Sequence, residues 1–166
     1  MESEYYSRFQ SLINNDELIN YLEENDMDLI FYPHHEMQRY LEHFSTSSKR
    51  IKVAEAEKYE VQELLKESKI LITDYSSIAF DFAYMRKPVI YYQFDKKEYF
   101  SQHYQKGYFD YERDGFGAVV AEKDELINEL IKAGNEGKDD TYLQRANKFF
   151  PIYDRENCKR HYELIR

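Results

Sequence analysis

The sequence is poor in residues that cross-link or interrupt a chain. It has no tryptophan, one cysteine, three prolines and five glycines in 166 residues. Because Cys158 is the single cysteine, an internal disulfide is excluded, which is typical of a reducing compartment. No Gly-, Ser- or Pro-rich linker and no internal repeat divides the chain, so we expect one compact domain over residues 1–166.

Two further absences narrow the class of function. No apolar run approaches the ~20 residues of a bilayer-spanning helix, and the first residues lack the basic and apolar regions of a secretory signal. The formal net charge is −9, from 23 basic and 32 acidic residues, which argues against a general affinity for nucleic acid or anionic lipid. A hydrophobic content of 42% excludes a disordered chain.

Short apolar runs alternate with segments of helical periodicity. We expect strands at residues 28–32, 50–53, 70–72, 89–92 and 118–120, with helices between them and further helices over about 139–166. Short, continuously apolar strands separated by helices are typical of a parallel sheet that is covered on both faces. The predicted fold class is therefore α/β, with a Rossmann-like parallel sheet.

A polar turn follows the third expected strand. Asp74, Ser76 and Ser77 stand where that strand would lead into a helix, at the carboxyl edge where open parallel sheets bind ligands. Free N–H groups, the helix dipole and two hydroxyls favour an anion there, and Asp81, one helical turn further, suits a ribose diol. The residues therefore predict a nucleotide diphosphate site. The alternative is that Asp74 or Ser76 simply caps the helix.

Two other segments carry candidate residues. His34 follows the first expected strand and could donate to a phosphate or move a proton near neutral pH; a histidine packed at a helix start is the alternative. The following residues resemble the zinc motif H-E-x-x-H, but Arg39 replaces its last histidine, so we predict no metal site. Residues 93–117 are expected to form a long loop, in which Arg113 or the lysines at 96, 97 and 106 could neutralise a pyrophosphate or simply face solvent.

The strings ILITDYSSIAFDFAYMRKPVIYYQFD and GYFDYERDGFG, with FYPHHEMQRY upstream, resemble a known family. It is the CDP-glycerol:poly(glycerophosphate) glycerophosphotransferases, the teichoic-acid primases and polymerases, and the resemblance runs from about residue 18 to 120. It implies a GT-B-type fold of two Rossmann-like halves. This chain resembles the C-terminal, donor-binding half; the N-terminal acceptor half, with its Trp-His-Gly-type segment, is absent.

The resemblance also implies roles for single residues. His34 matches a histidine expected near the donor phosphates, Ser76 and Ser77 match diphosphate-binding serines, and Asp81 matches a ribose-binding carboxylate by its spacing from Asp74. His35 stands where the family usually has proline, a substitution expected to let the His34 loop move.

The resemblance implies CDP-glycerol as the substrate ligand, CMP as the product and no tightly bound cofactor. In the full-length protein the acceptor would be a lipid-linked polymer, at the cytoplasmic face of the bacterial membrane. Alone, this chain would bind the donor without turnover. Three alternatives remain: a non-catalytic interaction domain, half of a transferase for another donor such as CDP-ribitol or a nucleotide sugar, and a receiver-like module. The last lacks the acidic pair it needs after its first strand.

Overall fold

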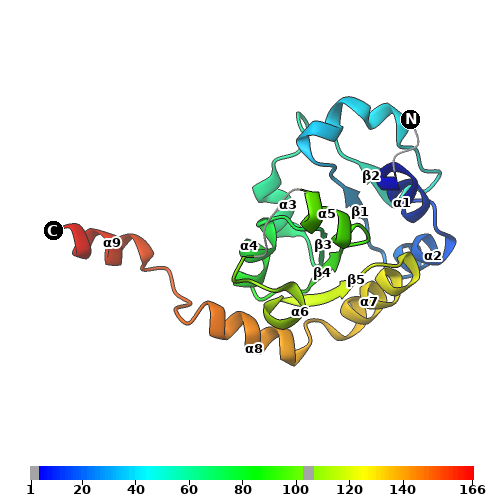
Figure 1. Cartoon of the computed structure of the whole chain (residues 1–166). Helices are drawn as coiled ribbons and strands as arrows, with labels where there is room; N and C mark the ends of the chain where they lie inside the picture. Colours follow the sequence, from blue (N-terminus) through cyan, green and yellow to red (C-terminus); the bar gives the residue numbers. More distant parts are fainter. Residues whose placement is uncertain (1–3, 103–106) are drawn as a thin grey trace.

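Parallel strands form the centre of the molecule (Figure 1). The computed structural model describes residues 4–102 and 107–166. Within them the strands are β1 (Leu29–Phe31), β2 (Ile51–Val53), β3 (Leu71–Thr73), β4 (Val89–Tyr92) and β5 (Gly117–Val120). They form two hydrogen-bonded parallel groups, β1 with β2, and β3, β4 and β5 in that order. Each strand lies within a residue of its predicted bounds, but the strands pair in two groups in place of the expected single sheet. The strands are only three or four residues long and offer few pairing sites.

Helices connect the strands. Their bounds are α1 (Glu4–Leu12), α2 (Asp16–Glu24), the 3₁₀ helix η1 (His35–His43), α3 (Val61–Glu67), α4 (Ile78–Tyr84), α5 (Lys96–Gln102), α6 (Tyr111–Asp114), α7 (Lys123–Glu136), α8 (Asp140–Phe149) and α9 (Asn157–Ile165). The prediction of a long loop over residues 93–117 was wrong, because α5 and α6 lie within it. Helices this short offer too few positions for a periodic pattern to appear.

Strand β4 is buried on both faces, as its unbroken apolar sequence predicts. Ile90 and Tyr92 join a core cluster with residues of α1, α2 and α7, whereas Val89 and Tyr91 join a second cluster with residues of α4 and α8. The alternation follows from the two-residue period of a strand. Helices therefore cover both faces of the parallel strands.

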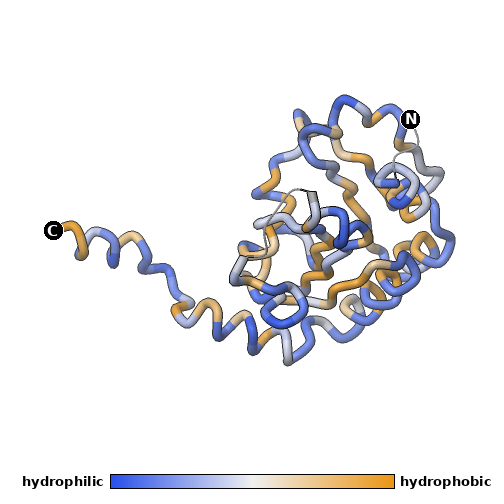
Figure 2. The backbone as a smooth tube through the Cα atoms, viewed as in Figure 1, coloured by the Kyte–Doolittle hydropathy of each residue, from blue (hydrophilic) through white to orange (hydrophobic). Residues whose placement is uncertain are grey.

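The C-terminal helices extend along one side of the molecule (Figure 1). Helix α8 packs on the body through Ala146, which is fully buried, while α9 projects away and leaves Leu164 and Ile165 exposed. Figure 2 shows hydrophobic residues along the central strands and at this C-terminal end. None of the described helices is both long and apolar enough to cross a membrane.

One buried cation lies away from the sheet's carboxyl edge. The Nζ of Lys138, just beyond α7, is buried and has no hydrogen-bond partner among the described residues. Burial and the nearby Arg86 guanidinium lower the pKa of Lys138 to about 8. In the unfolded chain the pKa of Lys138 has its ordinary value near 10.5. Between pH about 8 and 10.5 the unfolded chain therefore binds more protons than the folded protein. The stability of the wild-type protein should therefore rise with pH across that window.

Lys138→Met is expected to stabilise the protein at pH 7 by about 1 kcal/mol, a value discounted because the side chain is only partly buried. Methionine keeps the apolar stem and removes the desolvated charge. The gain should vanish as pH rises through the window from about 8 to 10.5. Urea unfolding at pH 7 and above pH 10 measures both effects, with Lys132→Met, an exposed neighbour, as control. A variant as stable as wild type at pH 7 would contradict the argument.

Candidate functional site

The carboxyl ends of β1 and β3 carry the predicted polar residues. Strand β1 leads through the buried Pro33 to His34, and β3 leads into the turn formed by residues 74–77, which opens α4. His34, Asp74, Ser76 and Ser77 are all exposed. The structure therefore places these four residues at strand ends, as predicted. It shows no hydrogen bond or ring contact between His34 and the turn in the described part of the chain.

The turn is closed by its own side chains. The carboxylate of Asp74 accepts a hydrogen bond from the Ser76 N–H (3.1 Å), and the Ser76 hydroxyl oxygen accepts one from the Ile78 N–H (3.4 Å). Asp74 and Ser76 thus act as local caps, the alternative raised by the sequence. Ser77 differs, because it precedes α4 without making a side-chain capping bond. Its hydroxyl is available to a ligand.

Aromatic side chains also hold the turn in place, and the sequence did not predict these contacts. The Tyr75 ring stacks on Tyr99 at 3.6 Å between ring centres, and the Tyr75 hydroxyl donates to Asp95 (2.8 Å). The Tyr111 hydroxyl of α6 donates to the Tyr75 carbonyl oxygen (3.0 Å). Burial, followed by the hydrogen bond to Asp95, raises the pKa of Tyr75, and burial raises that of Tyr111 to about 12. Both phenols therefore remain protonated donors at neutral pH.

A further tyrosine reaches the same edge from α1. Burial raises the pKa of Tyr5 to about 12, and the Asp74 carboxylate adds to the rise because it is near enough to disfavour a second negative charge. The cluster of tyrosines around Asp74 comes from four separate segments. The only signal in the sequence was the high tyrosine content, 17 residues, which does not say which of them meet.

His34 sits at the start of η1 with one ring nitrogen engaged. Its Nδ1 accepts a long hydrogen bond from the Glu36 N–H (3.5 Å), and its ring lies 4.1 Å from that of His35. The Nε2 of the exposed ring has no partner among the described residues. His34 therefore caps η1 and still presents Nε2 outward.

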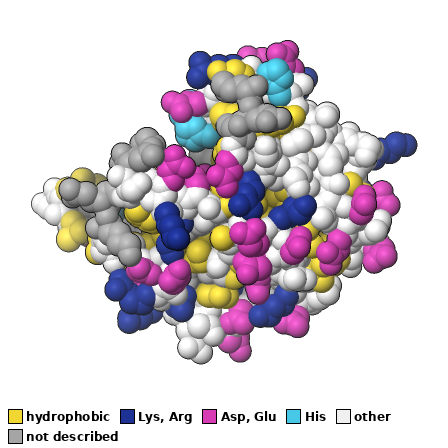
Figure 3. Space-filling view, turned by 45° about the vertical axis from the view of Figure 1, so that its right-hand side comes forward, with side chains coloured by type: hydrophobic (Ala, Val, Ile, Leu, Met, Phe, Trp, Pro, Cys, Tyr) yellow, Lys and Arg dark blue, Asp and Glu magenta, His cyan; other side chains and the backbone are white. Residues whose placement is uncertain are grey.

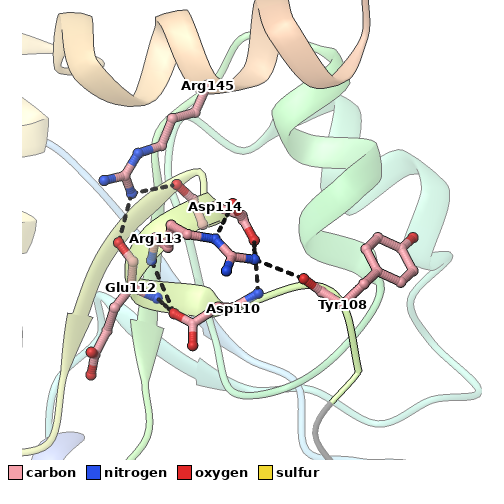
Figure 4. Close-up of polar contacts among 7 residues, drawn as sticks. Tyr108, Asp110, Glu112, Arg113, Asp114 and Arg145 are labelled. Carbon is pink, nitrogen blue, oxygen red and sulfur yellow. Dashed lines mark hydrogen bonds and ion pairs between the residues drawn. The ribbon is translucent and has the colours of Figure 1, made fainter.

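Asp81 and Arg113 differ in how strongly other groups hold their side chains. Asp81 lies exposed in the first turn of α4, whereas the Arg113 guanidinium is held by the Asp114 carboxylate (2.9 and 2.5 Å) and the Tyr108 carbonyl (2.8 Å) (Figure 4). The Arg113 hydrogen bond holds the pKa of Asp114 at about 2. Arg113 must leave this pair to reach a ligand, so its role in neutralising a pyrophosphate stays a prediction.

Helix α6 is tied in place by neighbouring groups. The Asp110 carboxylate caps it by accepting from the Glu112 and Arg113 N–H groups, and Arg145 of α8 donates to the Glu112 and Gly115 carbonyls (3.0 and 3.1 Å) (Figure 4). These bonds anchor the helix that carries Tyr111 and hence one side of the Asp74 turn.

The lysines predicted to neutralise a pyrophosphate do not form a patch of positive charge among the described residues. Lys96 pairs with Glu112 at 2.6 Å, Lys97 is exposed, and Lys106 lies outside the described residues. On the face drawn in Figure 3, basic and acidic side chains are interspersed. Among the described residues no three His, Cys, Asp or Glu side chains gather into a possible metal-ligand set.

These features define a class: an α/β domain of parallel strands covered by helices, with a polar strand–helix turn at the carboxyl edge. Comparison with known families makes the assignment specific. The model of the CDP-glycerol:poly(glycerophosphate) glycerophosphotransferase family matches residues 2–166, and the chain belongs to this family.

Relatives with known names support the assignment. The minor teichoic acid biosynthesis protein GgaB of Bacillus subtilis (strain 168) is 37% identical over 99% of this chain, which spans 18% of GgaB. The teichoic acid ribitol-phosphate polymerase TarL of Staphylococcus aureus (strain NCTC 8325 / PS 47) is 28% identical over 89% of the chain, which spans 25% of TarL. The chain thus spans a quarter or less of these two relatives.

The fold is shared with a solved structure. The wall teichoic acid polymerase TagF matches with a TM-score of 0.65 and 23% identity, over 85% of this chain and 33% of that one. A TagF variant soaked with CDP-glycerol matches with the same TM-score. The match confirms the predicted fold class, in which helices flank parallel strands.

Proposed function

We propose that this chain is the C-terminal, donor-binding domain of a glycerophosphotransferase. The full protein would transfer glycerol phosphate from CDP-glycerol to a teichoic-acid or related cell-surface polymer and release CMP. The observation that carries the proposal is the exposed Asp74–Ser77 turn at the carboxyl edge, with an unengaged Ser77 hydroxyl, in a member of this family. The CDP-glycerol soak of a TagF variant, which shares the fold, supports the choice of ligand.

The proposed chemistry is a phosphoryl transfer. An acceptor hydroxyl attacks the phosphorus that bears glycerol, the bond from that phosphorus to the oxygen it shares with the CMP phosphate breaks, and CMP leaves. Such reactions depend on positioning and on stabilising charge at the phosphoryl oxygens. Ser76, Ser77 and His34 would donate to those oxygens, and Asp81 would accept from the ribose hydroxyls. Arg113, released from Asp114, would add positive charge.

The remaining parts of the reaction belong to the rest of the proposed protein. The chain spans only 18% of GgaB and 33% of TagF, which supports a separate acceptor half that carries the general base. We therefore expect residues 1–166 to bind the donor without catalysing transfer. In the full-length protein the acceptor would be lipid-linked, at the cytoplasmic face of the membrane. Measurable transfer of glycerol phosphate by the chain alone would contradict this division.

The test is a titration of the 166-residue chain with CDP-glycerol, CMP, CDP-ribitol and UDP, followed by heteronuclear NMR. We expect CDP-glycerol and CMP to shift resonances of His34, Ser76, Ser77 and Asp81, and UDP to shift them less. Stronger binding of CDP-ribitol would favour the ribitol donor, to which the similarity with TarL points. No shifts with any nucleotide at millimolar concentration would contradict donor binding and favour an interaction domain.

Ser77→Ala is expected to weaken CDP-glycerol binding roughly ten- to hundredfold, the effect of losing one hydrogen bond to a charged group. Stability should not change, because the Ser77 hydroxyl makes no capping bond. Ser68→Ala, at the opposite end of β3, is the matched control and should bind as the wild type does. Equal affinity of Ser77→Ala and wild type would remove Ser77 from the site.

A further inference from the structure

Gln93 is a buried polar residue directly after β4. Its side chain is 2% exposed, and its backbone N–H donates to the Val120 carbonyl of β5 (2.8 Å). The side-chain Nε2 donates to the Asp74 carbonyl oxygen (3.2 Å). The side-chain Oε1 is buried and has no hydrogen-bond partner among the described residues. The amide thus connects the end of β4 to the first residue of the polar turn.

This contact orients a peptide of the turn. The bond between Asp74 and Tyr75 is trans, so its carbonyl and its N–H point in opposite directions. Because the Asp74 carbonyl faces the buried Gln93 amide, the Tyr75 N–H points away from it. The Tyr75 carbonyl is held in turn by the Tyr111 hydroxyl (3.0 Å). Side chains from two other elements therefore fix two successive carbonyls of the turn.

The unpartnered Oε1 shows that this amide is not the best residue for stability alone. A buried acceptor without a partner is costly, and an apolar side chain of the same size would avoid that cost. What an apolar residue cannot supply is the donor to Asp74. The contribution of Gln93 that depends on its polarity is therefore this hydrogen bond, which satisfies the Asp74 carbonyl and orients the turn.

We propose that Gln93 is a positioning residue for the donor phosphates: it holds the Asp74–Tyr75 peptide so that the Tyr75 N–H faces the ligand. The inference rests on the proposed function of the turn. Gln93 itself is buried and touches no ligand; it acts through Asp74 and Tyr75. The Tyr75 N–H thus adds a backbone donor to the Ser76 and Ser77 hydroxyls of the turn. Its direction is set by a residue that lies 19 positions beyond Asp74 in the sequence.

The test compares Gln93→Met with Tyr92→Phe in the 166-residue chain. Methionine matches the shape of glutamine without its donor. Tyr92→Phe is the matched control, since it removes a buried hydroxyl from the preceding residue, the last of β4, whose ring belongs to the core cluster with α1, α2 and α7. Three readouts are needed: the amide resonance and hydrogen exchange of Tyr75, the Kd for CDP-glycerol, and the urea midpoint.

For Gln93→Met we expect a shifted Tyr75 amide resonance with faster exchange and a Kd for CDP-glycerol raised roughly three- to tenfold. The urea midpoint should change little, because methionine removes the unpaired Oε1 but leaves the Asp74 carbonyl without its donor. Tyr92→Phe should leave the Kd and the Tyr75 amide unchanged. Wild-type affinity in Gln93→Met would overturn the proposal. If the wild-type chain binds no CDP-glycerol, the proposed function is contradicted independently of Gln93. The Tyr75 amide resonance of Gln93→Met then tests the role of Gln93. A shifted resonance supports control of the turn by Gln93, and an unchanged resonance overturns it.

Discussion

Replacing Gly117 by alanine is expected to destabilise the protein by more than about 3 kcal/mol, enough to unfold many domains of this size. Gly117 begins β5 and pairs with Val89 of β4. A Cβ atom at this position would overlap the carbonyl oxygen and carbon of Val89. These are backbone atoms, which cannot rotate out of the way as a side chain can. The two strands would have to separate, and their pairing would be lost.

Gly117→Ala should also abolish donor binding. The register of β5 against β4 places the Val120 carbonyl where it accepts a hydrogen bond from the Gln93 N–H, and separation of the strands would break this bond next to the polar turn. Urea unfolding and CDP-glycerol titration measure the two effects. Gly107→Ala is the control: nothing lies within 4 Å of an added Cβ, and a change within about 0.5 kcal/mol is expected. An unfolding midpoint for Gly117→Ala equal to that of wild type would contradict the close approach of the two strands.

Lys87→Met is expected to cost about 2 kcal/mol. The Lys87 Nζ donates to three carbonyl oxygens at the end of α3, those of Leu65 (3.0 Å), Lys66 (2.5 Å) and Ser68 (2.8 Å). The last carbonyls of a helix have no partner within the helix, so this ammonium satisfies groups that would otherwise stay unpaired. Methionine preserves the apolar stem but provides neither a donor nor the positive charge that Nζ places 5.2 Å from the centre of the Phe82 ring.

Urea unfolding of Lys87→Met against Lys66→Met isolates this effect. Lys66 is exposed and its Nζ pairs only with Glu63 one helical turn away, so its replacement should change stability by less than about 0.5 kcal/mol. If the two variants had equal stability, the three carbonyls would have to be satisfied by water, and Lys87 would not be a helix cap.

Local chemistry accounts for the part of the fold that the sequence predicts. Strand β4 was predicted within its observed bounds, because four consecutive apolar residues after Pro88 leave little alternative to a buried strand. The strand order was not predicted in detail, since pairing depends on contacts between segments that are distant in the chain. Helix α6 was missed because its four residues are too few to show a helical period. Its Asp110 cap is local, but Arg145 from α8 completes its anchoring.

The candidate site likewise has features that the local sequence predicts and features that it does not. A strand followed by Asp74, Ser76 and Ser77 at a helix start is a local pattern, and the structure places all three on the exposed turn. What the pattern could not reveal is that Asp74 and Ser76 cap the turn while Ser77 does not. It also could not show that Arg113 is paired with its neighbour Asp114.

The sequence by itself determined the α/β class, the five strand positions, the family resemblance and the location of the polar turn. Each of these depends on residue order over a few positions, through strand periodicity, helix capping or motif spacing. Only the tertiary structure decided which groups hold that turn. Tyr75, Gln93, Tyr99 and Tyr111 meet Asp74 or one another because parallel strands bring their carboxyl ends to one edge. Those contacts join residues up to 36 positions apart, which no local pattern encodes.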